Sequence, residues 1–220
     1  MRVLTWNLFH GRAVPPAGRS LQHEFATALA RWDWDVALLQ ETPPWWPPLL
    51  AAEHDVALTS RNALLPLRRA LAERWPDLMR SGGGSANAIL VRAPERITAR
   101  ARRRLRLWPE RRVVHAVRLE PSGVWVANLH AQVHSEVRAR ADAAAAAAAV
   151  RRWAGDDGAV VLGGDFNVRR PGAEGFTHAG GHGVDHVLVR HLRATGRPQV
   201  LDRGPLSDHA PVLVELTLAS

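Results

Sequence analysis

The stretch Val160-Val-Leu-Gly-Gly-Asp-Phe-Asn167 places an aspartate and an asparagine at the end of a short apolar run. A run of this length, bounded by glycine, is typical of a buried strand. Asp and Asn after a strand usually belong to a turn, because their side chains hydrogen-bond the nearby backbone. The stretch therefore indicates function only if other strands of the chain carry similar ends.

Five further segments carry similar polar ends, each with a carboxylate, an amide or an imidazole beside apolar residues. These polar residues are Asn7 after residues 2–6, Glu41 after 36–39, His130 after 123–129, Asp185 within 184–189, and Asp208 with His209 before 210–218. Each alone has a plain structural explanation, as a turn residue, a cap, a buried histidine or a partner of a nearby arginine. Six strands with such ends in one chain predict a single polar pocket.

The rest of the pattern predicts strands that alternate with two or three helices. Residues 2–8 alternate between two faces, as a strand does, and a Pro-Ser-Gly turn predicts a hairpin between strands at 112–119 and 123–129. The clearest helix is 135–153, which is rich in alanine and has Ser135 as its predicted cap. Further helices are predicted near 21–29 and 64–75. Two packed sheets covered by helices follow from this order.

Composition excludes several classes of protein. The 220 residues fit one domain, residues 1–220, and the 46% apolar and 23% charged shares exclude a disordered chain, a collagen and a coiled coil. The absence of cysteine excludes disulfides, thiolate metal sites and thiol nucleophiles. The longest apolar run, 143–150, is far shorter than the roughly 20 residues that span a bilayer. We therefore expect a cytoplasmic monomer without membrane insertion.

The net charge is +8, with 29 basic residues against 21 acidic ones, and every basic residue is an arginine. We attribute part of this excess to GC-rich codons, which favour Arg over Lys. A positive field nevertheless attracts partners that carry phosphate, such as DNA or RNA.

Taken in chain order, seven short motifs resemble those of the endonuclease/exonuclease/phosphatase superfamily. They are Thr5-Trp-Asn7, Leu39-Gln-Glu41, Asn87-Ala-Ile-Leu90, Asn128-Leu-His130, Gly164-Asp-Phe-Asn167, Val184-Asp185 and Ser207-Asp-His209. The superfamily includes deoxyribonucleases, apurinic endonucleases, sphingomyelinases and inositol-polyphosphate phosphatases. The resemblance implies an α/β fold, a four-layer α/β sandwich in which two mainly antiparallel sheets lie face to face and helices flank them.

The resemblance implies a divalent cation, Mg²⁺ or as an alternative Mn²⁺, held by Glu41 with Asn7 and Asp208. This agrees with the preference of hard cations for carboxylate and carbonyl oxygens. The same resemblance places Asn87 and Asn128 in contact with the substrate.

The remaining motif residues correspond to the catalytic groups of the superfamily. By resemblance, Asp165 orients or deprotonates the attacking water and Asn167 hydrogen-bonds the phosphoryl oxygens. His209 donates to the phosphate opposite the metal, and Asp185 holds its other ring nitrogen. His130 contacts the phosphate or acts as a general acid. The implied reaction is in-line attack of water on a phosphate ester.

The chain departs from the superfamily pattern at three points. Phe9 stands where apurinic endonucleases carry an acidic residue. The glutamate that partners the deoxyribonuclease histidine has no clear equivalent, and Asp77 is a weak candidate. Only 17 residues separate Asn167 from Asp185, where many relatives carry a longer insertion. The chain therefore resembles a reduced core of the superfamily.

Three functions remain open at this point. The leading one is a metal-dependent phosphoesterase, above all a phosphodiesterase or nuclease. The alternative within enzymes is a phosphatase or diesterase for small or lipid phosphates. The alternative of another class is a catalytically silent protein that binds nucleic acid.

Two groups of side chains carry weaker signals. Arg102, Arg104 and Arg106 alternate along one predicted strand face, which is either solvated or follows a phosphate backbone. Four tryptophans near the N-terminus are expected in the core and in turns rather than as platforms for bases. They are Trp32, Trp34, Trp45 and Trp46.

Overall fold

The computed structural model describes residues 1–50, 55–58 and 66–219. Its elements are β1 (Arg2–Asn7), η1 (Phe9–Gly11), α1 (Gln22–Arg31), β2 (Val36–Thr42), α2 (Pro47–Leu50), β3 (Asp55–Leu58), α3 (Pro66–Arg74), α4 (Pro76–Met79), η2 (Arg80–Gly83), β4 (Ala86–Val91), β5 (Arg96–Arg106), β6 (Arg112–Glu120), β7 (Trp125–His130), α5 (Glu136–Ala154), β8 (Val160–Asp165), β9 (Thr177–His182), β10 (Asp185–Arg190), β11 (Leu192–Ala194), β12 (Gln199–Val200) and β13 (Val212–Leu218). Of the helix predicted near 64–75, residues 64 and 65 lie outside the described residues.

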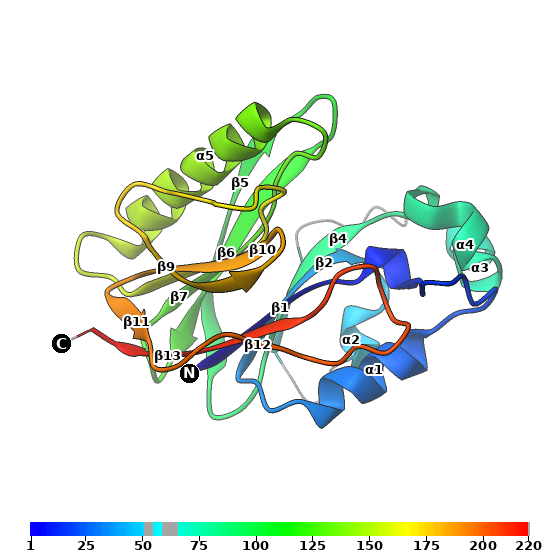
Figure 1. The fold of residues 1–220 in the computed structure, drawn as a ribbon, viewed down its shortest axis with the longest axis horizontal. Helices are drawn as coiled ribbons and strands as arrows, with labels where there is room; N and C mark the ends of the chain where they lie inside the picture. Colours follow the sequence, from blue (N-terminus) through cyan, green and yellow to red (C-terminus); the bar gives the residue numbers. More distant parts are fainter. Residues whose placement is uncertain (51–54, 59–65, 220) are drawn as a thin grey trace.

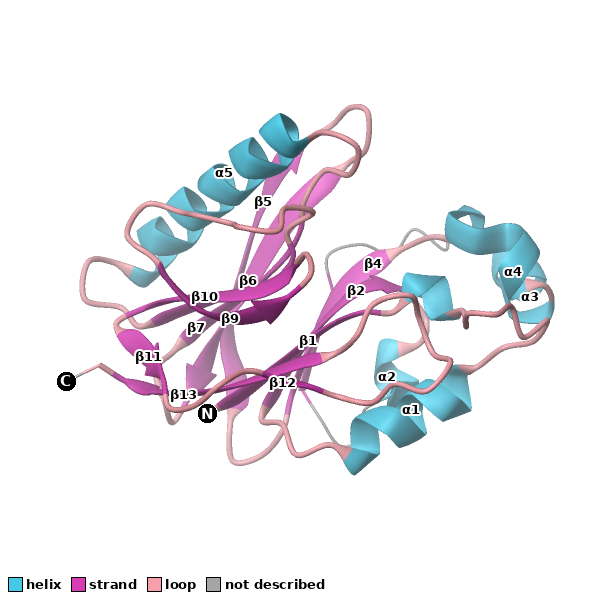
Figure 2. Cartoon of the chain, viewed as in Figure 1, coloured by secondary structure: helices cyan, strands magenta, loops and turns pink. Residues whose placement is uncertain are grey.

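Two sheets form the centre of the molecule, with seven and six strands in the described part of the chain (Figures 1 and 2). The first has the order β11-β13-β1-β2-β4-β3, and β12 also pairs with β13. The second has the order β5-β6-β7-β8-β10-β9. Each sheet holds one parallel pair, β1 with β2 and β7 with β8, and its other pairs are antiparallel. The predicted mainly antiparallel sheets are confirmed.

The two sheets pack face to face through apolar side chains that point alternately to the two faces of each strand. In β1, Val3 packs in a cluster with residues of both sheets, whereas Leu4 and Trp6 belong to a second cluster beneath α1. The cluster between the sheets is dominated by valine, a branched side chain that fits a pleated surface well. A period of two therefore gives β1 two apolar faces, one for the other sheet and one for the helices.

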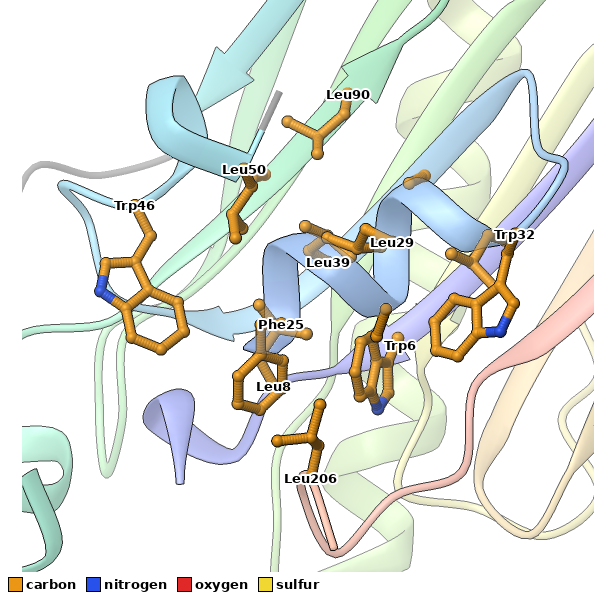
Figure 3. Close-up of a cluster of buried hydrophobic side chains, with 14 of the residues drawn as sticks. Trp6, Leu8, Phe25, Leu29, Trp32, Leu39, Trp46, Leu50, Leu90 and Leu206 are labelled. Carbon is orange, nitrogen blue, oxygen red and sulfur yellow. The ribbon is translucent and has the colours of Figure 1, made fainter. Parts of the chain in front are cut away.

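Helices cover the outer face of each sheet and complete the four predicted layers (Figure 1). Over the first sheet, Trp6 contacts Phe25 of α1 at 5.0 Å and Trp32 at 5.2 Å between ring centroids. Figure 3 shows this cluster, which also contains Trp46. Trp32, Trp34 and Trp46 are buried and Trp45 is partly buried against the same cluster, which confirms their predicted packing role.

The long helix α5 covers the second sheet with a face of small side chains. The Oγ atom of Ser135 accepts a hydrogen bond from the Arg138 N–H, as expected of a helix cap. Alanines such as Ala139 and Ala146 are fully buried against the sheet. Within the described residues, no helix is both long and apolar enough to span a bilayer.

The predicted arginine strip on β5 is wrong at one of its three positions. A shift of register between Arg104 and Arg106 takes Arg106 out of the alternation. Its guanidinium binds the buried Asp142 of α5 at 3.0 Å. A buried carboxylate needs such a partner, so Arg106 stabilises the fold, while Arg102 and Arg104 remain exposed on an edge strand.

Gly164 allows the two parallel strands of the second sheet to meet. Its φ is +139°, and a Cβ placed on it would lie 1.9 Å from the carbonyl oxygen of Leu129 in β7. The contact is with backbone, so no side-chain rotation relieves it. The glycine before Asp165 is therefore required by the pairing of β7 with β8.

We predict that Gly164→Ala lowers the free energy of unfolding by at least about 2 kcal/mol, since it combines backbone strain with a steric clash. Urea unfolding of the purified variant measures this. Gly172→Ala is the matched control, because a Cβ at Gly172 would meet no atom within 4 Å, and a change within about 0.5 kcal/mol is expected for it. Equal stability of the two variants would contradict the steric argument.

Candidate active site

The register of the strands explains how distant residues meet. His130 at the end of β7 lies opposite Asp165 at the end of β8, and Asp165 lies opposite Asp185 at the start of β10. In the first sheet, Asn7 at the end of β1 lies opposite Gln40 of β2. The ends of the parallel strands in both sheets thus point to the same side of the sandwich.

An open cleft of about 660 Å³ lies at these strand ends. Eight of the ten predicted site residues line it: Asn7, Glu41, Asn87, His130, Asp165, Asn167, Asp208 and His209. Asp185 lies behind His209 and is buried. Asn128 is the residue that the structure places elsewhere.

Asp185 and His209 form a hydrogen-bonded pair at one side of the cleft. His209 Nδ1 donates to Asp185 Oδ2 at 2.7 Å, which leaves Nε2 for the cleft. Burial alone would lower the pKa of His209, but the hydrogen bond and charge of Asp185, followed by the charges of Asp165 and Asp208, raise it to about 9. The pair therefore presents a protonated imidazole in a fixed orientation.

Asp165 occupies the floor of the cleft and contacts both sheets. Its Oδ2 accepts from Asn7 Nδ2 at 3.0 Å, and its Oδ1 accepts from the backbone N–H of Asn167 at 2.9 Å. Burial, and then the charge of Asp185, raise the pKa of Asp165 to about 6 despite the charge of His209. A carboxylate with a pKa near neutrality is suited to proton transfer.

A β-bulge directs Glu41 into the cleft. The register between β2 and β4 shifts between Leu39 and Thr42, and Glu41 has a left-handed φ of 47°. Bulges beside functional sites commonly redirect a side chain in this way. Glu41 Oε2 is bound by His10 Nε2 at 2.9 Å, whereas Oε1 lies 3.9 Å from His130 Nε2, beyond a hydrogen bond.

The charge of Glu41 is strongly favoured in this position. Burial would raise the pKa of Glu41, but the hydrogen bond from His10 and the charges of His10, His130 and His209 lower it to about 2. Glu41 is therefore an anion with one oxygen held by His10 and the other without a hydrogen bond among the described residues.

His130 is buried between the two carboxylates. Its Nε2 lies 3.6 Å from Asp165 Oδ2 and 3.9 Å from Glu41 Oε1. Burial, followed by the charge of Arg112, lowers the pKa of His130 to about 3 even though Glu41 opposes the shift. The ring is therefore neutral near pH 7.

The prediction that Asn128 contacts the substrate does not agree with its position. The residue is fully buried between the sheets. Its Nδ2 donates to the carbonyl oxygens of Leu39 at 2.9 Å and Ala88 at 2.8 Å, and its Oδ1 accepts from Gln40 Nε2 at 2.9 Å. Both amide hydrogens are used, so Asn128 has none for a ligand.

Two groups in the described part of the chain have the donors for a metal ion. Ligand atoms of Asp165, Asp185 and His209 all lie within 4.8 Å of one another. The second group is the predicted set of Asn7, Glu41 and Asp208, all of which line the cleft. Because His209 Nδ1 is used by Asp185, the free oxygen of Glu41 and its neighbours suit a hard divalent cation better.

The cleft also contains residues that the sequence did not predict, among them two pairs of basic or imidazole side chains. His10 and Arg12 follow Asn7 in Leu8-Phe-His-Gly-Arg12, while Arg80 and Arg112 come from η2 and β6. His and Arg directly after the Asn7 motif were the available signal for the first two. Arg80 and Arg112 gave none, because arginines occur throughout this chain.

Solved structures with known folds resemble this one over its whole length. The mannosyl-6-phosphatase of Bacteroides thetaiotaomicron has a TM-score of 0.76 and 18% identity, covering 99% of this chain and 100% of that one. D. rerio TDP2, humanized by 14 mutations, has a TM-score of 0.72 and 13% identity, covering 99% and 98%. An endonuclease/exonuclease/phosphatase from Beutenbergia cavernae has a TM-score of 0.70 and 20% identity, covering 99% and 71%. These TM-scores establish a shared α/β sandwich fold.

A search of curated protein sequences found no match. The sequence model that describes the Endonuclease/Exonuclease/phosphatase family matches residues 4–209. This range includes the strand-end residues of the cleft and every strand except β13, which follows it, and the first two residues of β1. The chain therefore belongs to the endonuclease/exonuclease/phosphatase family.

Proposed function

We propose that this protein is a Mg²⁺-dependent phosphodiesterase that hydrolyses nucleic acid, with Mn²⁺ as a substitute ion. The observation that carries the proposal is the arrangement of a protonated His209, a carboxylate Asp165 of raised pKa and an anionic Glu41 around one open cleft. An acid, a base and a cation ligand are the groups that in-line attack of water on a phosphate ester requires. The single domain, the monomeric state and the cytoplasmic location stay predictions from the sequence.

Glu41, Asn7 and Asp208 would hold the cation in this scheme. When bound, it would supply positive charge against a non-bridging phosphate oxygen. His10 would act through Glu41, because its Nε2 occupies one carboxylate oxygen and leaves the other directed to the cleft.

The remaining residues would bind the phosphate and move the protons. Asp165 would take a proton from the attacking water as the water oxygen bonds to phosphorus and the bond from phosphorus to the leaving ester oxygen breaks. The departing oxygen would take its proton from solvent in the open cleft. His209 would donate from Nε2 to a phosphoryl oxygen, with Asp185 fixing its tautomer through Nδ1. Asn167 would hydrogen-bond the same phosphate, because it lines the cleft and its backbone is fixed by Asp165. The neutral His130 would contact the phosphate beside Asp165.

Hydrolysis of bis(p-nitrophenyl) phosphate and of p-nitrophenyl phosphate tests the proposal directly. We expect the diester to be the better substrate, with activity lost in EDTA, and Glu41→Gln to lower the rate at least about 10²-fold, as the loss of a key electrostatic group does. The change keeps the size of the side chain and removes the charge that a hard cation needs. Calorimetric titration with Mg²⁺ should show no binding to this variant.

Glu110→Gln is the matched control, since Glu110 also lines the cleft but binds Arg112. It should retain Mg²⁺ binding and most of the activity. Normal Mg²⁺ affinity in Glu41→Gln would assign the ion to Asp165, Asp185 and His209 instead. Preference for the monoester would favour the phosphatase, and loss of all activity with nucleic-acid binding intact would favour the binding protein.

The role of His10 gives a second prediction, about metal affinity. His10→Ala should weaken Mg²⁺ binding about 10- to 100-fold, the usual effect of losing a partner of a metal ligand. His10→Gln should lose less, because its amide can still donate to Glu41. Calorimetry on both variants measures this, and unchanged Mg²⁺ affinity in His10→Ala would mean that the contact of His10 with Glu41 does not support the ion site.

The Asp185–His209 pair gives a third prediction, about pH dependence. The folded pKa of His209 is raised, so the protonated form persists until the pH passes about 9. Asp185→Asn removes the charge that raises it, so the alkaline limb of the pH–rate profile should move to lower pH. The turnover number should fall about 10²-fold, within the range for acid–base assistance, and Mg²⁺ affinity should change little.

The double variant Asp185→Asn/His209→Ala distinguishes a joint role from two separate ones. If the two residues act as one unit, it should be little slower than His209→Ala. Additive losses, or an unmoved alkaline limb in Asp185→Asn, would contradict the assignment.

A further inference from the structure

Arginines line both sides of the cleft. Three of them, Arg12, Arg80 and Arg111, lack a carboxylate partner among the described residues, and the first two lie together on the side of the first sheet. Arg12 and Arg80 stand near the end of the first sheet, and Arg111 and Arg112 at the start of β6. Arg112 is paired with Glu110. By contrast, the described residues provide no ion pair for Arg12 or Arg80.

Arg12 is held in place without using its terminal nitrogens. Its guanidinium carbon lies 3.6 Å from the centre of the Phe9 ring, and its Nε donates to the Phe9 carbonyl oxygen at 3.2 Å. The backbone carbonyl of Arg12 accepts from the Ser207 N–H at 2.8 Å. Phe9, which replaces the acidic residue expected at this position in apurinic endonucleases, thus supports a guanidinium whose two Nη groups have no hydrogen bond to the described residues.

The backbone around Arg12 explains why the side chain has this position. Phe9, His10 and Gly11 all have left-handed φ values, of 50°, 56° and 76°. A Cβ on Gly11 would lie 2.2 Å from the Trp46 ring, so the turn is packed closely on the core. Strain of this kind persists only where the surroundings enforce it and is common at ligand sites.

Arg80 brings a second positive charge to the same place. Burial, and then the charge of Arg80, lower the pKa of Arg12, while Asp77, Glu41 and Asp208 oppose the shift. Asp77 already accepts from the Gly18 N–H at 2.7 Å, and Glu41 and Asp208 are the proposed cation ligands. Two neighbouring guanidinium groups are best compensated by an anion that both can bind, and phosphate matches their geometry.

We propose that Arg12 and Arg80 form a subsite for a second phosphate group, next to the phosphate that is hydrolysed. The cleft then favours substrates with phosphates on neighbouring units, such as a nucleotide chain, over substrates with one phosphate. The subsite rests on the proposed function for its reacting phosphate, but its own binding is measurable without turnover.

Calorimetry of the Mg²⁺-loaded protein tests this binding with thymidine 3′,5′-bisphosphate and thymidine 5′-monophosphate. We expect the bisphosphate to bind at least about tenfold more tightly, since a second charged hydrogen-bonded contact is added. Arg12→Ala/Arg80→Ala should remove this difference. Fructose 1,6-bisphosphate as a third ligand distinguishes a sugar from a nucleoside as the carrier of the two phosphates.

Arg102→Ala/Arg104→Ala is the matched control, because it removes the same charge from the exposed edge strand β5. It should keep the preference for the bisphosphate. Arg80→Ala alone should reduce the preference for the bisphosphate over the monophosphate. This single variant replaces the double variant in the test if the Arg12 substitution prevents folding, because Arg80 is exposed and its substitution should not disturb the fold. An equal loss in the edge-strand control would show a general effect of charge and overturn the subsite.

Activity separates this proposal from the function on which it rests. The substrates are dTpdT and its 5′-phosphorylated form. The kcat/KM value of the 5′-phosphorylated form, divided by that of dTpdT, should fall at least about tenfold in Arg12→Ala/Arg80→Ala. If the protein hydrolyses both substrates equally and binds both thymidine phosphates equally, the subsite is wrong and the phosphodiesterase stands. If it hydrolyses neither, the phosphodiesterase is wrong, and the calorimetric preference alone decides the subsite.

Discussion

The buried amide of Asn128 joins the two sheets, and the geometry of the cleft depends on this connection. Its hydrogen bonds reach Gln40, the Leu39 carbonyl and the Ala88 carbonyl across the interface. The valines around it contribute apolar burial, which has no preferred direction and would tolerate a sliding of one sheet over the other. Hydrogen bonds in a dry interior are directional and costly to leave unmade, so they fix the offset between the strand ends of both sheets.

With that offset fixed, the site is divided between the sheets. The first sheet provides Glu41, and the second provides Asp165 and His130, while Asn7 Nδ2 links the two halves through Asp165. The same burial acts on each group, but different partners move the pKa values apart. Against the effect of burial, His10 lowers the pKa of Glu41 to about 2, whereas burial and then the charge of Asp185 raise the pKa of Asp165 to about 6. When the surroundings move the pKa values of two carboxyl groups apart in this way, the group with the low pKa remains charged and the group with the higher pKa can transfer protons.

Residues outside the strand-end pattern show where prediction from the sequence failed. Asn128 precedes His130 by two positions and was expected beside it in the cleft, yet it points between the sheets, where Gln40 and two carbonyls use it. Arg106 was expected on an exposed face, but a register shift brings it to Asp142. His10 follows the Asn7 motif closely, but the sequence does not show that its partner is Glu41. In each case the deciding partner lies far away in the chain, where periodicity gives no information.

The sequence by itself determined the strands, their apolar faces and the polar residues at their ends, because these depend on local alternation and on residue chemistry. Seven motifs in order were enough to indicate the four-layer sandwich and most of the residues around the cleft. The motifs also implied the pairing of Asp185 with His209. The tertiary structure alone decided other contacts: the bulge that turns Glu41 toward His10, and the stacking of Arg12 on Phe9 near Arg80. These contacts arise from strand register and sheet offset, which are set by packing across the whole molecule rather than by any one segment.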